Sequence, residues 1–246
     1  PPLVLVHGSG PGVTAYANWR LTLPVLAQEF RVLAPDIAGF GYTERAPDSD
    51  YNLDLWTDHL LGFLDALDLP VVDLLGNSFG GGISLALAVR APERIRRLVL
   101  MGSCGVPFKS TPGLEAVWGY EPSEENMRAM IELFAFDRSI ISDELVRSRY
   151  QASIRPGFHE TYSAMFRAPR QRHIERLATP NDKIRALDKP ALIIHGRDDQ
   201  VIPLQVSLDL HHLLTQSELH VFGQCGHWTQ IEHGRRFCHL VQDFLL

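Results

Sequence analysis

Short apolar runs alternate with amphipathic stretches along most of this 246-residue chain. The apolar runs have the length of strands, and we expect strands at residues 3–6, 32–34, 71–75, 98–101, 191–195 and 219–222. Helical spacing of apolar residues lies between them, at residues 19–30, 53–67, 80–90 and 204–214, and again from about Arg235. Strands that are apolar throughout are buried on both faces. The pattern therefore predicts an α/β fold with a mostly parallel sheet and helices on both of its faces.

Residues 106–180 interrupt this rhythm. The stretch is polar, has helical periodicity, carries many aromatic residues and contains no strong strand signal. We therefore expect a helical cap, or lid, at 106–180, inserted between two parts of a core formed by residues 1–105 and 181–246. One α/β domain with one insertion fits a chain of this length.

Composition and charge narrow the class of partner. The net charge of −6 is mild and no block of Lys and Arg occurs, which argues against nucleic acid and anionic membranes and favours a small molecule. We expect neither a transmembrane span, which needs roughly 20 apolar residues, nor a signal peptide. Three scattered cysteines favour a reducing, cytoplasmic location. The chain starts at Pro1 without Met, so we expect a further segment upstream.

A candidate nucleophile follows the third predicted strand. Residues 76–80, Gly-Asn-Ser-Phe-Gly, match the G-x-S-x-G pattern between an apolar strand and a helix. In that context the turn exposes the Ser78 hydroxyl at the carboxyl edge of the sheet, beside the amide groups that open the next helix. The alternative is a glycine-rich turn that serves close packing alone. The strand-to-helix context favours the nucleophile.

A serine hydroxyl needs an imidazole base and a carboxylate that orients the base. In the α/β-hydrolase fold these follow the serine in the order acid, then histidine, each after a late strand. Asp198 and Asp199 follow one late strand, and His227 follows the last one. Each has a plainer interpretation, as a turn aspartate or a loop histidine. The spacing leaves Asp198 and Asp199 as equal candidates for the acid.

Four segments of the core carry a resemblance to a known family. They are residues 7–12 (His-Gly-Ser-Gly-Pro-Gly), 18–19 (Asn-Trp), 76–81 (Gly-Asn-Ser-Phe-Gly-Gly) and 225–228 (Cys-Gly-His-Trp). Together they resemble the meta-cleavage-product hydrolases, which break carbon–carbon bonds in bacterial degradation of aromatic compounds. Cap residues 116–120 and 149–153 are similar to the branch that acts on monocyclic substrates. The resemblance covers essentially the whole chain, although members usually carry two further strands before the position of Pro1.

The resemblance implies a reaction and selects the acid. The acid of the family corresponds to Asp199. The implied substrate is a 2-hydroxy-6-oxohexa-2,4-dienoate, either 2-hydroxymuconate semialdehyde or a 6-alkyl analogue. Its products are 2-hydroxypenta-2,4-dienoate and a small carboxylic acid. The resemblance implies no metal and no organic cofactor, and it implies a homodimer or a higher homo-oligomer.

Further site residues follow from the same match. Arg149 corresponds to the residue that holds the substrate carboxylate, and the backbone N–H groups of Ser9 and Phe79 correspond to the oxyanion hole. Asn18 and Asn77 correspond to side chains that hydrogen-bond the dienol end. A solvated helix charge for Arg149 and turn-satisfying amides for the two asparagines are the alternatives.

Two aromatic residues, Phe134 and Trp228, are expected to wall the pocket around the substituent on carbon 6, although aromatic residues at helical spacing are often core. Cys225, two residues before His227, is expected to be a packing residue.

Other functions stay compatible with parts of this pattern. A generic carboxylesterase would use the same serine, aspartate and histidine. A non-catalytic receptor on the same scaffold would retain them without turnover. Dehalogenases and epoxide hydrolases are disfavoured, because these relatives carry an aspartate where this chain has Ser78.

Overall fold

The computed structural model describes residues 1–45 and 49–246. Within them six strands form one sheet in the order β2-β1-β3-β4-β5-β6, and each neighbouring pair is parallel. The strands are β1 (Leu3–Val6), β2 (Val32–Leu33), β3 (Val72–Asn77), β4 (Ile95–Met101), β5 (Ala191–Gly196) and β6 (Ser217–Phe222). The α/β class and all six predicted strands are confirmed.

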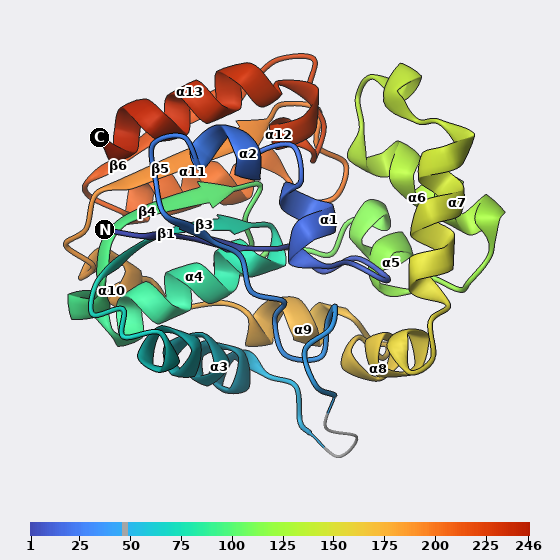
Figure 1. Cartoon of the computed structure of the whole chain (residues 1–246), viewed down its shortest axis with the longest axis horizontal. Coiled ribbons are helices and arrows are strands. Elements are labelled where there is room, and N and C mark those ends of the chain that lie inside the picture. The colour runs from blue at the N-terminus through green and yellow to red at the C-terminus, as the bar shows by residue number, and fades with distance from the viewer. Residues whose placement is uncertain (46–48) are drawn as a thin grey trace.

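Helices cover both faces of this sheet (Figure 1). They are α1 (Ala15–Trp19), α2 (Leu23–Leu26), α3 (Leu53–Ala66), α4 (Phe79–Arg90), α5 (Pro112–Trp118), α6 (Glu124–Phe134), α7 (Asp143–Ser153), α8 (Phe158–Met165), α9 (Gln171–Arg176), α10 (Asn181–Arg185), α11 (Leu204–Leu213), α12 (Thr229–Glu232) and α13 (Gly234–Leu245). Helices α3 and α4 lie against one face, and α2 and α13 lie against the other (Figure 1).

Alternation along the strands divides the apolar residues into two cores. In β1, Val4 and Val6 belong to the cluster that includes α3, α4 and α11, whereas Leu3 and Leu5 belong to the cluster that includes α2 and α13. All four side chains are fully buried. Successive strand residues point to opposite faces, so a strand covered on both sides is apolar at every position.

The stretch predicted as one helix over 19–30 is wrong in detail. Helix α1 begins earlier, at Ala15, where the Thr14 side chain accepts a hydrogen bond from the Ala17 N–H. It ends at Trp19, and α2 begins only at Leu23. Pro24 explains the break, because its ring would clash with the carbonyl of the residue four positions earlier, Arg20.

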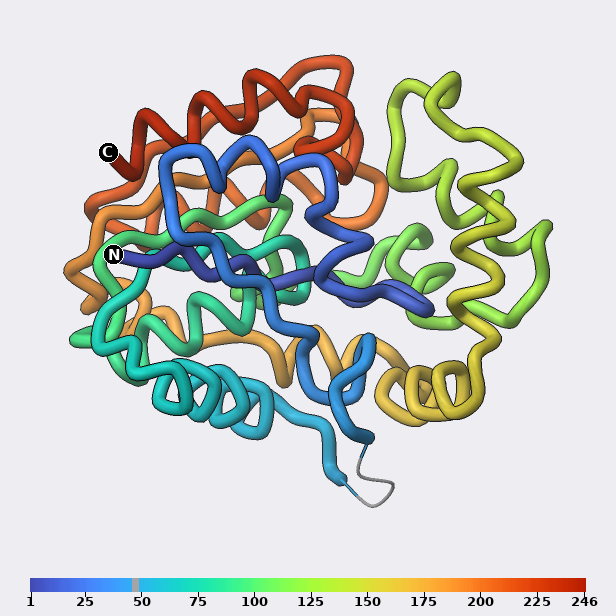
Figure 2. Tube along the Cα trace, in the orientation of Figure 1, coloured from blue at the N-terminus to red at the C-terminus, as the bar shows by residue number. Residues whose placement is uncertain are grey.

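Residues 106–180 contain helices and turns, and no strand forms in this fully described stretch. Their trace lies beyond the carboxyl ends of the strands, on the side away from both chain ends (Figure 2). The apolar cluster around α3 and α4 continues into α5, α6 and α9 without a break. Among the described residues, no helix is both long and apolar enough to cross a membrane.

Candidate active site

The turn between β3 and α4 consists of Ser78 alone. Its backbone has φ 55° and ψ −118°, a conformation that serine rarely adopts. Hydrogen bonds hold it there: the Ser78 N–H donates to the Met101 carbonyl at 2.8 Å, and the Ser78 carbonyl accepts from the Cys104 N–H at 3.0 Å. Such a conformation costs about 1–3 kcal/mol and persists where surrounding contacts impose it. The strained turn presents the Ser78 side chain to the pocket.

Close packing of α4 against β1 requires glycine just after the serine. A Cβ atom at Gly80 would lie 2.3 Å from the His7 carbonyl oxygen and 2.4 Å from that of Val6. Neither contact is tolerated by real side chains, and both oxygens belong to backbone that cannot move freely. The glycine therefore lets the first turn of α4 approach the end of β1, which brings Phe79 close to the His7–Gly12 loop.

Asp199 and His227 form a buried pair. The Nδ1–H of His227 donates to Asp199 Oδ2 at 2.6 Å, and both side chains are at most 4% exposed. Burial raises the pKa of the Asp199 carboxyl, but the charge and hydrogen bond of His227 and the N–H of Val201 outweigh it, so the net pKa is lowered. With Nδ1 engaged by Asp199, Nε2 is the ring nitrogen through which a neutral His227 can act as a base.

The neighbouring Asp198 has a different set of contacts. It pairs with Arg197 at 3.3 Å and accepts a hydrogen bond from the Cys225 N–H at 3.3 Å. Of the two aspartates that spacing could not separate, it is Asp199 that contacts His227.

Helix α6, within residues 106–180, reaches the histidine directly. The Phe134 carbonyl accepts hydrogen bonds from the N–H of His227 at 2.7 Å and from that of Trp228 at 3.2 Å. The Phe134 ring stacks on His227 at 5.7 Å and on Trp228 at 5.2 Å between centroids. The end of α6 therefore fixes both the backbone and the ring of His227.

Ser78 and His227 line one pocket of about 980 Å³. Ser78 Oγ forms no hydrogen bond to His227, nor to any other residue among 1–45 and 49–246. Hydrogen bonds of this kind are often long before the substrate binds. The structure thus brings the three predicted catalytic residues to one place and joins two of them directly.

Two backbone N–H groups near Ser78 find no acceptor in the part of the chain that the structure describes. Neither the N–H of Ser9 nor that of Phe79 donates a hydrogen bond within the described part of the chain. The Ser9 hydroxyl accepts from Trp118 Nε1 at 2.9 Å, which ties the glycine-rich loop to α5. Free, fixed donors on two converging turns are what an oxyanion requires.

The two asparagines line the same pocket. Asn18 Oδ1 accepts from the Gly8 N–H at 3.3 Å, and its Nδ2 is buried with no partner among the described residues. Asn77 donates to the Met101 carbonyl at 3.3 Å. Both amides are therefore partly engaged with backbone and partly open to a ligand.

Arg149 reaches the pocket from α7, and its Nη2 donates to the Pro11 carbonyl at 3.4 Å. Burial, and secondly the positive charge of Arg20, lower the pKa of Arg149 to about 10. No acidic side chain in the described ranges forms an ion pair with it.

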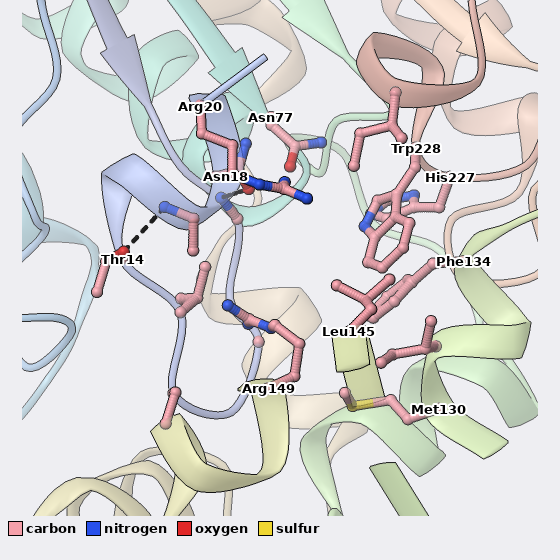
Figure 3. Close-up of a pocket in the computed structure, with 18 of the residues that line it drawn as sticks. Thr14, Asn18, Arg20, Asn77, Met130, Phe134, Leu145, Arg149, His227 and Trp228 are labelled. Atoms are coloured by element: carbon pink, nitrogen blue, oxygen red, sulfur yellow. Dashed lines mark hydrogen bonds between the residues drawn. The ribbon is translucent and has the colours of Figure 1, made fainter. Parts of the chain in front are cut away.

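The walls of this pocket differ in polarity (Figure 3). One side is formed by Thr14, Asn18, Arg20 and Asn77, and the other by Met130, Phe134, Leu145 and Trp228. Such a pocket suits a molecule with one charged end and one apolar end.

Comparison with known proteins agrees with this geometry. A family model described as the alpha/beta hydrolase fold matches residues 1–234. A 2-hydroxymuconate semialdehyde hydrolase of Pseudomonas sp. strain CF600 is 63% identical over 244 residues, which cover 99% of this chain and 86% of that protein. The solved structure of the meta-cleavage product hydrolase CumD from Pseudomonas fluorescens IP01 has a TM-score of 0.98 and 55% identity, and the match covers 99% of this chain and 90% of CumD. The chain belongs to the meta-cleavage product hydrolases, within the α/β-hydrolase family.

A further relative is 59% identical over 244 residues, covering 99% of this chain and 88% of its own length. It is a 2-hydroxy-6-oxo-2,4-heptadienoate hydrolase of Pseudomonas putida. This meta-cleavage product hydrolase is therefore an enzyme of the serine hydrolase type, as the sequence predicted.

Two residues of the site were missed by sequence reasoning. Arg20 lines the pocket of this meta-cleavage product hydrolase, next to the Asn-Trp pair that carried the resemblance. Glu232, five residues after His227, accepts from the Gly226 N–H at 2.7 Å, the Phe136 N–H at 2.8 Å and the Asp137 N–H at 2.9 Å. The position of Arg20 beside Asn18 was a usable signal, but the contact of Glu232 with the cap region had none in the sequence.

Cys225 lies beside this network and is fully buried. Burial raises the pKa of its thiol well above the usual range, and the nearby Glu232 carboxylate raises it further. A thiol that stays protonated near neutral pH is a poor nucleophile, so the structure agrees with a packing role for Cys225.

Proposed function

We propose that the protein hydrolyses the bond between carbons 5 and 6 of a 2-hydroxy-6-oxohexa-2,4-dienoate, either 2-hydroxymuconate semialdehyde or a short 6-alkyl ketone. The names of the 63% and 59% identical relatives support this substrate class. The observation that carries the proposal is the His227–Asp199 hydrogen bond of 2.6 Å, at the base of a pocket that contains Ser78.

The proposed reaction has two stages. First the substrate tautomerises: the 2-hydroxyl loses its proton and carbon 5 gains one, which gives the 2,6-dioxo form. A nucleophile then adds to carbon 6, and collapse of the tetrahedral oxyanion breaks the bond to carbon 5. The electron pair of that bond delocalises into the 2-oxo group, and protonation yields 2-hydroxypenta-2,4-dienoate. If water is the nucleophile, the fragment with carbon 6 leaves directly as a carboxylic acid. If Ser78 Oγ is the nucleophile, the fragment remains as an ester of Ser78, and a water molecule hydrolyses that ester to release the acid and regenerate the serine.

Ser9, Ser78 and His227 line the pocket, Asp199 contacts His227, and Phe79 follows Ser78. Nε2 of His227 removes the proton of the nucleophile, which is Ser78 Oγ or a water molecule that Ser78 orients. The Asp199 carboxylate keeps the imidazole in the required tautomer and stabilises its charged form. The N–H groups of Ser9 and Phe79 stabilise the oxyanion on carbon 6.

Substrate recognition uses both walls of the pocket. In the proposal Arg149 holds the carboxylate, and Asn18 and Asn77 hydrogen-bond the 2-hydroxyl end. Phe134 and Trp228 contact the substituent on carbon 6. The division of the chain belongs to the same proposal: residues 106–180 form the cap, and residues 1–105 with 181–246 form the core that carries Ser78.

Two assays on the purified protein test the reaction. Loss of the yellow dienolate absorbance reports cleavage of the dienoate, and release of p-nitrophenol reports ester hydrolysis. We expect turnover of 2-hydroxymuconate semialdehyde or its 6-methyl analogue to exceed ester turnover by far. Ester hydrolysis with an unchanged dienolate signal would favour a carboxylesterase, and tight binding without either turnover would favour a receptor.

The assembly and location are part of the proposal. A homodimer or higher homo-oligomer is implied by the resemblance, and light scattering on the purified protein measures it. A cytoplasmic location is supported by three cysteines that are all buried and unpaired. Fractionation of the producing cells tests the location.

A further inference from the structure

Arg20 extends into the pocket from the core side. It follows the last residue of α1, its side chain is exposed, and it lines the pocket together with Asn18 and Asn77. Figure 3 shows its guanidinium pointing into the cavity beside Asn18. The break between α1 and α2, which Pro24 imposes, fixes where this side chain leaves the helix.

The charges that line the pocket are unbalanced. The charged side chains that line it are three arginines and one glutamate: Arg20, Arg149, Arg155 and Glu144. Arg155 is engaged at the rim, where it donates to the Tyr42 hydroxyl. Arg20 and Arg149 form no ion pair within the described ranges. The whole chain carries a net charge of −6, so two unpaired guanidinium groups in one pocket are not explained by a generally basic surface.

The two arginines line the same pocket, Arg20 from the segment after α1 and Arg149 from α7 (Figure 3). In agreement with that placement, the charge of Arg20 is the second cause, after burial, that lowers the pKa of Arg149. Two like charges near each other repel, and an anion placed between them relieves the repulsion. A carboxylate has about four lone-pair sites, so it can accept hydrogen bonds from two guanidinium groups at once.

We propose that Arg20 is a second cation for the substrate, which draws the 2-hydroxydienoate end into the pocket and holds it together with Arg149. This inference rests on the proposed function, since the proposed substrate supplies the anion. Arg149 binds from the cap side and Arg20 from the core side. Because Arg20 is exposed, its main effect is on capture of the anion, which depends on ionic strength.

The test compares Arg20→Gln with a matched control, Arg31→Gln. Arg31 is exposed and precedes β2, so it lies at the amino ends of the strands, whereas the pocket is lined by residues that follow β1 and β3. Its loss therefore removes the same charge away from the pocket. For 2-hydroxymuconate semialdehyde at about 10 mM ionic strength, we expect Arg20→Gln to lower kcat/KM by roughly five- to tenfold, mostly through KM. At about 0.5 M salt the loss should shrink to about twofold, because salt screens the exposed charge.

A neutral ester, p-nitrophenyl acetate, serves as the second substrate. Arg20→Gln should affect it less than it affects the dienoate, and Arg20→Lys should restore most of the dienoate activity. Equal losses on both substrates, or a loss that is independent of salt, would overturn the role of Arg20. So would kinetics identical to those of Arg31→Gln. A wild-type enzyme that leaves the dienolate absorbance unchanged would instead overturn the proposed function, and the wild-type assay alone reports this.

Discussion

Ser78 and His227 are held by different means. The serine is fixed by backbone strain and by hydrogen bonds of its own peptide groups, with its hydroxyl left unengaged. The histidine is held through its backbone N–H, by the Phe134 carbonyl, and also through its side chain, by Asp199 on Nδ1 and by the Phe134 ring on its face. Replacing the serine hydroxyl therefore removes chemistry with little loss of packing, whereas replacing the imidazole removes both.

Ser78→Ala should lower turnover of the dienoate by about 10³-fold or more, because the nucleophile or its water-orienting group is lost. The dienolate absorbance measures turnover, and thermal unfolding provides the control. We expect the unfolding midpoint to move little, since no side-chain hydrogen bond of Ser78 is lost. If turnover decreases by less than about tenfold, Ser78 is neither the nucleophile nor the residue that orients water.

Arg149→Ala should act mainly on substrate binding. An orphaned carboxylate contact costs a few kcal/mol, which corresponds to an increase in KM of about 100-fold. The fold should tolerate the change, because Arg149 has no carboxylate partner among the described residues and its removal relieves the burial of a charge. Separate measurement of kcat and KM distinguishes a loss of substrate binding from a loss of catalysis. A variant that binds and turns over normally would show that Arg149 does not hold the substrate.

At the scale of elements, helix α12 connects the loop that carries His227 to the segment that follows α6. Glu232 at its end accepts from the Gly226 N–H with one oxygen and from the N–H groups of Phe136 and Asp137 with the other. Both oxygens are needed as acceptors, so a glutamine, which has a single acceptor oxygen, can serve one side only.

Glu232→Gln should lower kcat by about tenfold, because the backbone beside His227 loses a fixed partner. It should also lower the free energy of unfolding by about 1–2 kcal/mol. Urea unfolding and the dienolate assay measure the two effects. Glu218→Gln, which removes the same charge from an exposed position of β6, is the control. If the two variants have the same kcat and the same free energy of unfolding, the Glu232 contacts contribute to neither activity nor stability.

The elements differ in how well sequence predicts them. Strands β1, β3, β4 and β5 were predicted because they are buried on two faces, which leaves a continuous apolar run in the sequence. The edge strands β2 and β6 are only partly buried, and their shorter apolar runs still marked them. The break near Arg20 was missed, although Pro24 marks it, because apolar spacing on either side continues the helical pattern. The contacts of Glu232 with Phe136 and Asp137 join segments about 95 residues apart in sequence. Such pairings leave no periodic signal, and neither does the direction in which Arg20 points.

Sequence patterns identified some residues of the site individually and left others as alternatives. Order along the chain and position after strands indicated Ser78 and His227, but local spacing gave no preference between Asp198 and Asp199. That preference depends on which carboxylate the loop turns inward, a tertiary property. The structure shows Asp199 buried against His227 and Asp198 beside Arg197.

At the scale of the whole molecule, buried histidines couple stability to pH. The Nε2 of His7 accepts from the Ile37 N–H at 2.9 Å, so it must stay unprotonated in the folded state. Burial lowers the pKa of His7, and burial likewise lowers that of His195. The unfolded chain therefore binds more protons than the folded one as pH falls below the ordinary value of about 6.5.

The free energy of unfolding should consequently decrease as pH falls from about 7 to about 5, by up to about 1.4 kcal/mol per pH unit for each such histidine. Urea unfolding at several pH values measures the slope. His7→Gln keeps an acceptor for Ile37 but removes the titration, so its slope should be smaller. The lowered pKa of Asp199 acts in a separate window, below about pH 4. A flat profile between pH 7 and 5 would contradict the expected proton uptake.

The unusual backbone conformation of Ser78 sets the thermal stability of the protein against its catalytic activity. Glycine would adopt φ 55°, ψ −118° without strain, so Ser78→Gly should melt at a higher temperature than Ser78→Ala while both are inactive. Serine at this position therefore lowers resistance to heat in return for a hydroxyl that the proposed reaction requires.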